Sequence, residues 1–238
     1  MTSRSSGGGW STTAPPSSPR LPSLAEAGDA IIRVCRRLWE ARLIAGADGN
    51  VSVRVGPDTL LVTPRGLLKG ELTAQDLVRV SLTGTPLGGF RKATSELDLH
   101  LRIYQARPDV GAVVHAHPPN ATGFAVAGEG LPATVLPELT VLFGEVPLVP
   151  YATPGTPAVG DAMAPFLGRH DGVLLANHGA VTWGADLMSA QIRMESLEHA
   201  ARILLAARTI GRVVHLTPEQ VHELARPRGK SGHDQAEP

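Results

Sequence analysis

The sequence has one cysteine, no excess of charge of either sign and no long hydrophobic run. Cys35 has no partner in the chain for a disulfide bond, and it falls on the apolar side of an expected helix. Lys+Arg and Asp+Glu number 22 each, which argues against a nucleic-acid or anionic-membrane partner, because such surfaces need excess positive charge. Since no apolar run could cross a membrane and no signal-peptide core is present, we expect a soluble, cytoplasmic protein.

Two familiar site motifs are also absent. The sequence has no phosphate-binding P-loop and no GxGxxG stretch, so a nucleotide site has no support. No serine lies on a nucleophile-elbow sequence, which argues against a Ser/His hydrolase.

The composition divides the chain into one domain and two tails. Residues 1–23 are rich in Ser, Gly, Thr and Pro and cannot bury enough surface to offset the entropy of ordering, so we expect a disordered N-terminal tail. Residues 227–238 are expected to form a similar C-terminal tail. Residues 24–226 show no repeat and no linker, which predicts a single folded domain.

Hydrophobic periodicity within this domain alternates between strands and helices. Pairs of strands joined by short turns, mixed with helices, predict an α/β protein with three layers (α/β/α) and a mainly antiparallel central sheet. The pattern predicts helices over 24–43, 95–106, 120–127, up to about 167, 187–208 and 218–224, and strands over 51–55, 60–63, 77–82, 111–114, 145–149, 172–176 and 180–183.

His115 and His117 lie at the end of a predicted buried strand, just before Pro118. Side chains alternate with period two along a strand, so the two imidazoles point the same way, with Cα atoms about 7 Å apart, and can share one metal ion. His178 follows another apolar strand at a turn and is the third candidate ligand. The alternative is histidines that are satisfied by hydrogen bonds. The other histidines are expected on surfaces or helix faces: His100, His170, His199, His215, His222 and His233.

Glu96 is the candidate acid/base, because a carboxylate in front of a metal can move a proton while the metal stabilises an enediolate. Its simpler interpretation is an acidic residue placed at the positive end of a helix, which Thr94 or Ser95 would cap.

Three loops could form an anion-binding cradle, because each offers backbone N–H groups or short polar side chains. They contain Gly49-Asn50, Arg65-Gly66 and Thr94-Ser95. Each loop taken alone is explained equally well as a turn or a cap.

Taken together, these stretches resemble the class II aldolase/adducin family. The similarity extends over about residues 46 to 205, in the order that the family shows. The matching pieces are Gly49–Arg54, Thr63–Gly66, Thr94–Glu96, Ala112–His117 and Asn177–Gly179.

The resemblance implies a zinc-dependent aldolase of carbohydrate metabolism. It implies Zn2+ on His115, His117 and His178, with Mn2+ or Co2+ as alternatives, and Glu96 as the acid/base. The implied phosphate site contains Asn50, Gly66, Thr94 and Ser95, to which Arg65 could add an anion contact. The implied reaction cleaves a ketose 1-phosphate similar to L-fuculose 1-phosphate into dihydroxyacetone phosphate and an aldehyde, in a homotetramer with active sites between subunits.

Two departures from the family pattern keep other reactions open. Arg65 replaces a small hydroxyl residue, which would suit a carboxylate-bearing substrate of a decarboxylase. The tyrosine that the aldolases donate from a neighbouring subunit has no match, and Glu138 could take its place or be an ordinary loop carboxylate. A dehydratase of the same superfamily is a further alternative. Glu96 argues against the epimerase branch, which has aspartate there, and the three histidines argue against a non-catalytic adducin-like protein.

Overall fold

The structure is a computed structural model that describes residues 21–225. Residues 1–20 and 226–238, which contain nearly all of the two expected tails, lie outside the described range. The first helix begins at Leu24, where the sequence predicts the folded domain to begin.

One eight-stranded sheet forms the middle of the molecule, in the order β4-β3-β2-β1-β5-β8-β7-β6. Its central strand β5 is buried along its whole length and lies between β1 and β8. The strands are β1 (Asn50–Gly56), β2 (Thr59–Val62), β3 (Val78–Ser81), β4 (Pro86–Gly88), β5 (Ala112–Ala116), β6 (Leu148–Val149), β7 (Gly172–Leu175) and β8 (Gly179–Gly184).

The sheet is mixed, and the expectation of a mainly antiparallel sheet misses one parallel pair. Six neighbouring pairs are antiparallel, but β6 and β7 run parallel. The reason is the connection between them: α5 (Pro157–Leu167) crosses over one face of the sheet and returns the chain to the same edge, as a parallel pair requires. The sequence pattern does not show which strands such a crossover joins.

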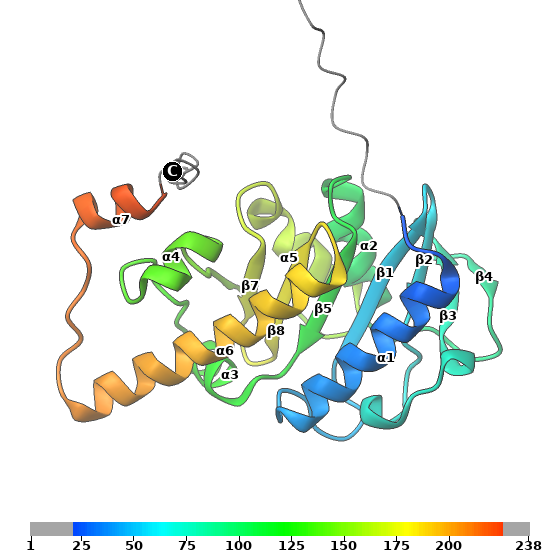
Figure 1. The fold of residues 1–238 in the computed structure, drawn as a ribbon, viewed down its shortest axis with the longest axis horizontal. Helices are drawn as coiled ribbons and strands as arrows, with labels where there is room; N and C mark the ends of the chain where they lie inside the picture. Colours follow the sequence, from blue (N-terminus) through cyan, green and yellow to red (C-terminus); the bar gives the residue numbers. More distant parts are fainter. Residues whose placement is uncertain (1–20, 226–238) are drawn as a thin grey trace, which may run out of the picture.

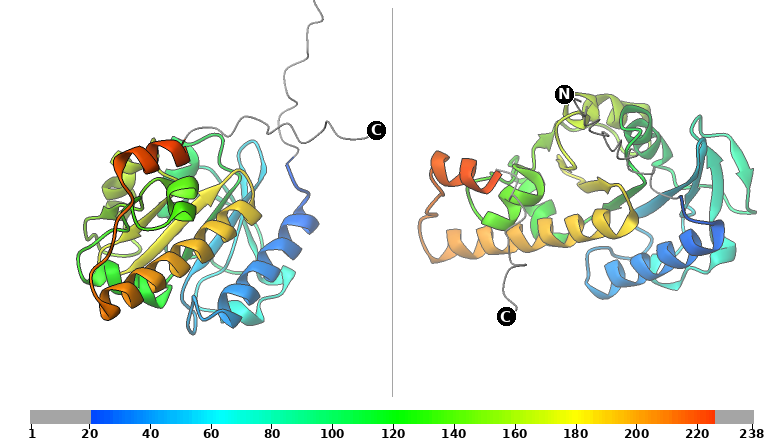
Figure 2. Two further views of the ribbon diagram at one scale, coloured as in Figure 1. Left: turned by 60° about the vertical axis from the view of Figure 1, so that its left-hand side comes forward. Right: turned by 45° about the horizontal axis from the view of Figure 1, so that its top comes forward.

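Helices cover both faces of the sheet, so the three-layer α/β/α prediction is confirmed. On one face, shown in Figures 1 and 2, lie α1 (Leu24–Glu40), α3 (Pro119–Val126), α4 (Pro137–Phe143) and α6 (Leu187–Ile210). The other face packs against α2 (Leu97–Ala106) and α5. The remaining elements are α7 (Pro218–Ala225), beside α4, and the short 3-10 helices η1 (Lys69–Glu71) and η2 (Ala74–Asp76).

Each face of the sheet has its own hydrophobic core. One contains Ile31 of α1 and Met194 of α6, and the other contains Ile103 of α2 and Met163 of α5. Cys35 is buried in the first, as its place on the helix predicts. No helix in residues 21–225 combines the length and hydrophobicity that a membrane crossing would need.

Local differences from the expected elements have simple causes. Helix α1 ends at Glu40 instead of residue 43, because Arg42 adopts a left-handed backbone conformation with φ of 58°. The short elements α4 and β4 are not predicted, since neither is long enough to show a period. Helix α2 begins at Leu97, and its N-cap is Glu96, without a capping side chain, so the predicted cap by Thr94 or Ser95 is wrong.

Candidate metal centre and anion site

The sheet brings the three candidate metal ligands together. Asn50 of β1 lies opposite His115 of β5, and Ala180 of β8 lies opposite Ala116, which places the turn before β8 beside the two strand-end histidines. That turn carries His178. One nitrogen from each of His115, His117 and His178 lies within 4.8 Å of the others, so the three imidazoles could hold a metal ion.

Two glycines make this close approach possible. Gly49 has φ of 70°, and a Cβ atom there would lie 2.9 Å from the backbone oxygen of His115. A Cβ atom at Gly179 would lie 2.5 Å from the oxygen of Ala116 and 2.6 Å from Cδ2 of His117. Any side chain at either position would push a loop away from the histidines.

The buried His115 ring is oriented for metal binding. Its Nδ1 lies 3.0 Å from the backbone oxygen of Ala180, which can only accept, so Nδ1 carries the proton. The free Nε2 lies 3.2 Å from Nε2 of His117 and 3.2 Å from Oε2 of Glu96. Three electron-rich atoms converge there, and such an arrangement needs a proton or a metal ion between them.

Glu96 faces the histidines from the start of α2. Oε1 of Glu96 lies 3.2 Å from Nε2 of His178, and it is buried without a hydrogen bond among the described residues. Burial alone would raise the pKa of the Glu96 carboxyl, but the neighbouring His115 and His178 outweigh burial and lower it, so the carboxylate is charged. A buried oxygen without a donor, beside three imidazoles, fits a site that receives a cation.

His117 lies at the open side of the cluster. Burial, together with the charges of His115 and His178, lowers the pKa of His117 to about 4, so its ring is neutral near pH 7 and able to bind a metal. Its Nδ1 lies 3.4 Å from Oδ2 of Asp48. The nitrogen ligands suit zinc and similar divalent ions, and the side open to solvent leaves room for a substrate.

The three predicted anion-binding loops are joined by backbone hydrogen bonds. Thr63 N–H donates to Val51 O (3.0 Å), Thr94 N–H donates to Thr63 O (3.1 Å) and Arg65 N–H donates to Lys92 O (3.1 Å). The structure thus places the loops of Asn50, Arg65-Gly66 and Thr94-Ser95 side by side, next to Glu96.

This region has unused donors. In the described part of the chain, no acceptor meets the N–H groups of Gly66 and Ser95. A Cβ atom at Gly66, which has φ of 75°, would meet nothing within 4 Å. The exposed side chain of Arg65 has no hydrogen bond or ion pair with any described residue. These groups are available to an anion.

Lys69 lies beneath these loops, a position that no pattern in the sequence predicts. Lys69 is only 2% exposed. Its Nζ donates to the backbone oxygens of Ala47 (2.8 Å) and Leu67 (2.9 Å), which belong to two neighbouring loops. Burial lowers the pKa of Lys69. A lysine in a polar loop is normally exposed, so no sequence signal distinguishes this one.

Two other predictions meet a different outcome. His100, expected on a surface or helix face, is fully buried behind Glu96, which corrects that expectation. The His100 ring lies 2.5 Å (Nε2) from Oδ1 of Asn50, and the Asn50 side chain donates to Glu96 Oε2 (2.8 Å). Glu138 is exposed in the first turn of α4 and makes no side-chain hydrogen bond or ion pair within residues 21–225, so one copy of the chain does not bring it to the histidines.

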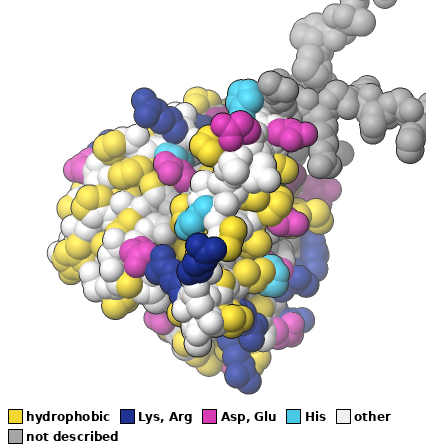
Figure 3. All heavy atoms as spheres, turned by 90° about the vertical axis from the view of Figure 1, so that its left-hand side faces the viewer, with side chains coloured by type: hydrophobic (Ala, Val, Ile, Leu, Met, Phe, Trp, Pro, Cys, Tyr) yellow, Lys and Arg dark blue, Asp and Glu magenta, His cyan; other side chains and the backbone are white. Residues whose placement is uncertain are grey.

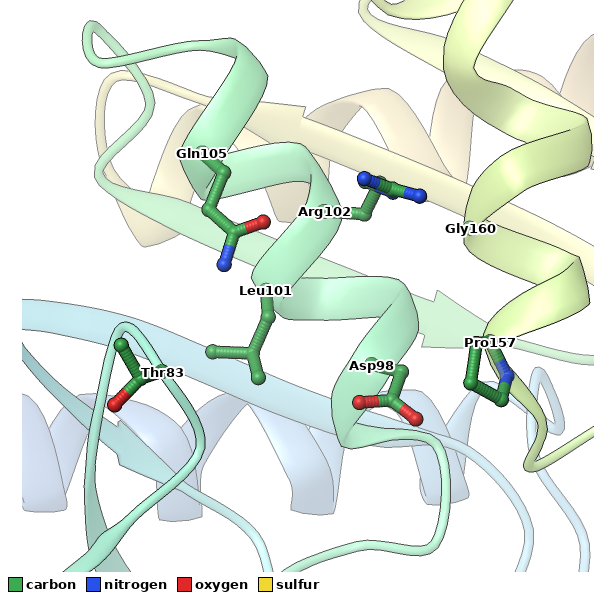
Figure 4. A pocket seen from close by; sticks show the side chains of 7 residues that line it. All are labelled: Thr83, Asp98, Leu101, Arg102, Gln105, Pro157 and Gly160. Carbon is green, nitrogen blue, oxygen red and sulfur yellow. The ribbon is translucent and has the colours of Figure 1, made fainter.

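A pocket of about 190 Å³ lies on the other side of α2 (Figure 4). Its one guanidinium, from Arg102, is already paired with Asp161 of α5, and none of the candidate site residues lines it. The pocket is therefore separate from the site. Its lining residues are Thr83, Asp98, Leu101, Arg102, Gln105, Pro157 and Gly160.

The chain is similar to several known proteins along most of its length. The L-fuculose phosphate aldolase of Methanococcus maripaludis is 36% identical over 172 residues, which cover 72% of this chain and 92% of that protein. The 3-oxo-tetronate 4-phosphate decarboxylase of Pectobacterium atrosepticum is 33% identical over 212 residues, covering 86% and 95%. The crystal structure of YgbL from Klebsiella pneumoniae superposes with a TM-score of 0.79 at 31% identity, covering 85% of this chain and 99% of YgbL.

Residues 29–205 match the family described as the Class II Aldolase and Adducin N-terminal domain. That range contains all the histidines and acidic residues of the centre described above. The chain belongs to the class II aldolase/adducin family.

Proposed function

We propose that this protein is a metal-dependent aldolase that cleaves a ketose 1-phosphate, similar to L-fuculose 1-phosphate, into dihydroxyacetone phosphate and an aldehyde. The observation that carries the proposal is the convergence of His115, His117 and His178 on the charged Glu96. We assign the three histidines as ligands of Zn2+, with Mn2+ or Co2+ as alternatives. Glu96 is the acid/base.

The chemistry needs one charge stabiliser and one proton carrier. When bound, the metal ion supplies a Lewis acid that stabilises negative charge on the carbonyl and hydroxyl oxygens of the substrate. Glu96 takes up a proton from solvent and delivers it to C3 after the C3–C4 bond has broken, which converts the enediolate into dihydroxyacetone phosphate. The pKa of Glu96 is lowered in the absence of substrate, so the carboxylate is in the form that takes up a proton in the reverse direction.

The substrate phosphate is assigned to the joined loops. The free N–H groups of Gly66 and Ser95 point to this role, and Thr94 and Arg65 are the side chains available beside them. The Asn50 amide already serves Glu96, so its part in holding the phosphate is secondary.

We propose a homotetramer with active sites between subunits, in which Glu138 comes from a neighbouring copy. The end of the molecule that carries α4 and α7 exposes hydrophobic side chains among charged ones (Figure 3). Val141 of α4 is 62% exposed and Ile210 at the end of α6 is 88% exposed, which supports an interface near Glu138. In the cleavage direction, Glu138 would take the proton of the C4 hydroxyl. A nucleic-acid or membrane partner is not part of the proposal.

A second candidate is decarboxylation of a 3-oxo sugar-acid phosphate. Arg65 favours it, because an unpaired guanidinium suits a substrate with a carboxylate as well as a phosphate. Loss of CO2 from 3-oxo-tetronate 4-phosphate also leaves the enediolate of dihydroxyacetone phosphate, which Glu96 can protonate. The two reactions therefore share one half of the mechanism and differ in the leaving group. Dehydration of a sugar phosphate is a third use of the same centre.

The test compares L-fuculose 1-phosphate and 3-oxo-tetronate 4-phosphate on one metal-loaded sample. Dihydroxyacetone phosphate is measured in both reactions, together with aldehyde or CO2. Release with fuculose 1-phosphate supports the aldolase, and release only with the oxo acid replaces it by the decarboxylase. No release from either substrate, in protein that has bound metal, rejects both.

A further inference from the structure

A chain of buried polar side chains leads from Glu96 into the core. Asn50 Nδ2 lies 2.8 Å from Glu96 Oε2, and Asn50 Oδ1 lies 2.5 Å from Nε2 of His100. On the other side of the ring, His100 Nδ1 lies 2.7 Å from Oγ of Ser52, which lies 2.9 Å from the hydroxyl of Tyr104. Four residues of this network are each at most 4% exposed: Asn50, Ser52, His100 and Tyr104.

Chemistry allows one direction of donation along this chain. A carboxylate only accepts, so Asn50 must turn its NH2 group to Glu96 and its carbonyl oxygen to His100. His100 Nε2 must then carry a proton. Burial lowers the pKa of His100 to about 3, with a smaller contribution from His115, so the ring is neutral and Nδ1 accepts from Ser52.

Tyr104 lies at the far end of this network. Its hydroxyl donates to the backbone oxygen of Ser52 (3.0 Å) and lies 2.9 Å from Ser52 Oγ. The donors of Ser52, His100 and Asn50 all point toward Glu96, and aligned hydrogen bonds of this kind strengthen one another in a low-dielectric interior. If one member lost its partner, the others would be left as buried unsatisfied groups.

We propose that His100 is a positioning residue for the reaction, acting through Asn50 to fix the Glu96 carboxylate against the metal-binding histidines. The inference rests on the proposed function for its consequence, although the hydrogen-bond direction stands without it. A neutral His100 that donates from Nε2 holds the Asn50 amide in one orientation. If the amide turned over, its oxygen would face the carboxylate and repel it.

The kinetic test compares two substitutions of His100. His100→Leu removes both hydrogen bonds, and we expect kcat to fall by about 10- to 100-fold, with KM and metal content unchanged. His100→Gln keeps an N–H donor near the position of Nε2 and should recover most of the loss. Ile103→Val, a conservative core change on the same helix α2, is the matched control and should leave kcat unchanged.

Three outcomes of these measurements of turnover and metal content would overturn the proposal. These are full activity in His100→Leu, a loss of metal that parallels the loss of kcat, or an equal loss in Ile103→Val. Tyr104→Phe removes only the outermost donor and should have a smaller effect than His100→Leu; a larger effect would also contradict the proposed direction.

A measurement without turnover separates this inference from the proposed function. In protein labelled with 15N-histidine, NMR spectra should show His100 as the neutral tautomer with the proton on Nε2 across about pH 5 to 8. The tautomer with the proton on Nδ1, or a charged ring, would overturn the inference even in an active enzyme. The Nε2 tautomer in a protein with no lyase activity would reject the proposed function and keep the assigned hydrogen-bond direction.

Discussion

The candidate metal centre and the candidate anion-binding loops are neighbours, but they are built in opposite ways. His115 is fully buried at the end of a central strand, and Glu96 faces it with support from Asn50. Arg65 and Ser95, by contrast, are exposed, and several of their donors are unused. The buried part has little freedom to change, so we expect it to provide the enediolate chemistry that the candidate reactions share. The exposed part can vary without disturbing the fold, so we expect it to select the substrate.

Removing one of the proposed metal ligands should have the largest effect, because the buried centre would then lose its metal ion. We expect His117→Ala to lose bound metal and activity together, because two imidazoles cannot hold the ion as three do. Metal analysis by mass spectrometry and an assay of dihydroxyacetone phosphate check both. His199→Ala, on the exposed part of α6, is the control. A variant without His117 that stays active and loaded with metal would contradict the site.

Glu96→Gln should separate metal binding from proton transfer. The amide keeps the shape of the side chain but cannot take up a proton, so we expect kcat to fall by about 10²- to 10⁴-fold while metal stays bound. The measurement is turnover and metal content on the same sample. Unchanged turnover would remove Glu96 from the mechanism.

Glu138→Gln tests the residue that we assign to a neighbouring subunit. Aldol cleavage needs a group to take the C4 hydroxyl proton, so we expect a loss of about 10²-fold in that reaction. Decarboxylation needs no such group and should be unaffected. Equal rates of aldol cleavage for variant and parent protein would show that Glu138 is an ordinary surface carboxylate.

Arg65→Ser should have the smallest effect, because Arg65 belongs to the exposed half. We expect KM to rise by about tenfold, with kcat unchanged, since a charge-assisted contact to the substrate is lost. Steady-state kinetics with a phosphorylated substrate measure the change. Arg36→Ser, an exposed arginine of α1, is the control. If kcat fell and KM did not, Arg65 would belong to the reacting centre instead.

The features that the sequence predicts are those that follow from local patterns. His115 and His117 were identifiable because the period of a strand puts them on one side, and the turn at His178 follows a clear apolar strand. The hairpin of β1 and β2 and the long helices follow from equally local patterns.

Features that depend on packing between distant segments could not be predicted. The burial of His100 arises because α2 lies against β1, about fifty residues earlier in the chain, and the sequence of α2 alone does not show this. The parallel pairing of β6 with β7 involves a strand of only two residues. Lys69 looks like any loop lysine until two loop carbonyls are seen to surround it.

The most direct test of the account is a metal titration of one purified sample. Protein stripped with a chelator is given Zn2+ in steps, and release of dihydroxyacetone phosphate is measured at each step with both candidate substrates. The account predicts that activity rises linearly and levels off at about one ion per chain. Full activity in the stripped protein, or no binding of metal at all, would contradict it.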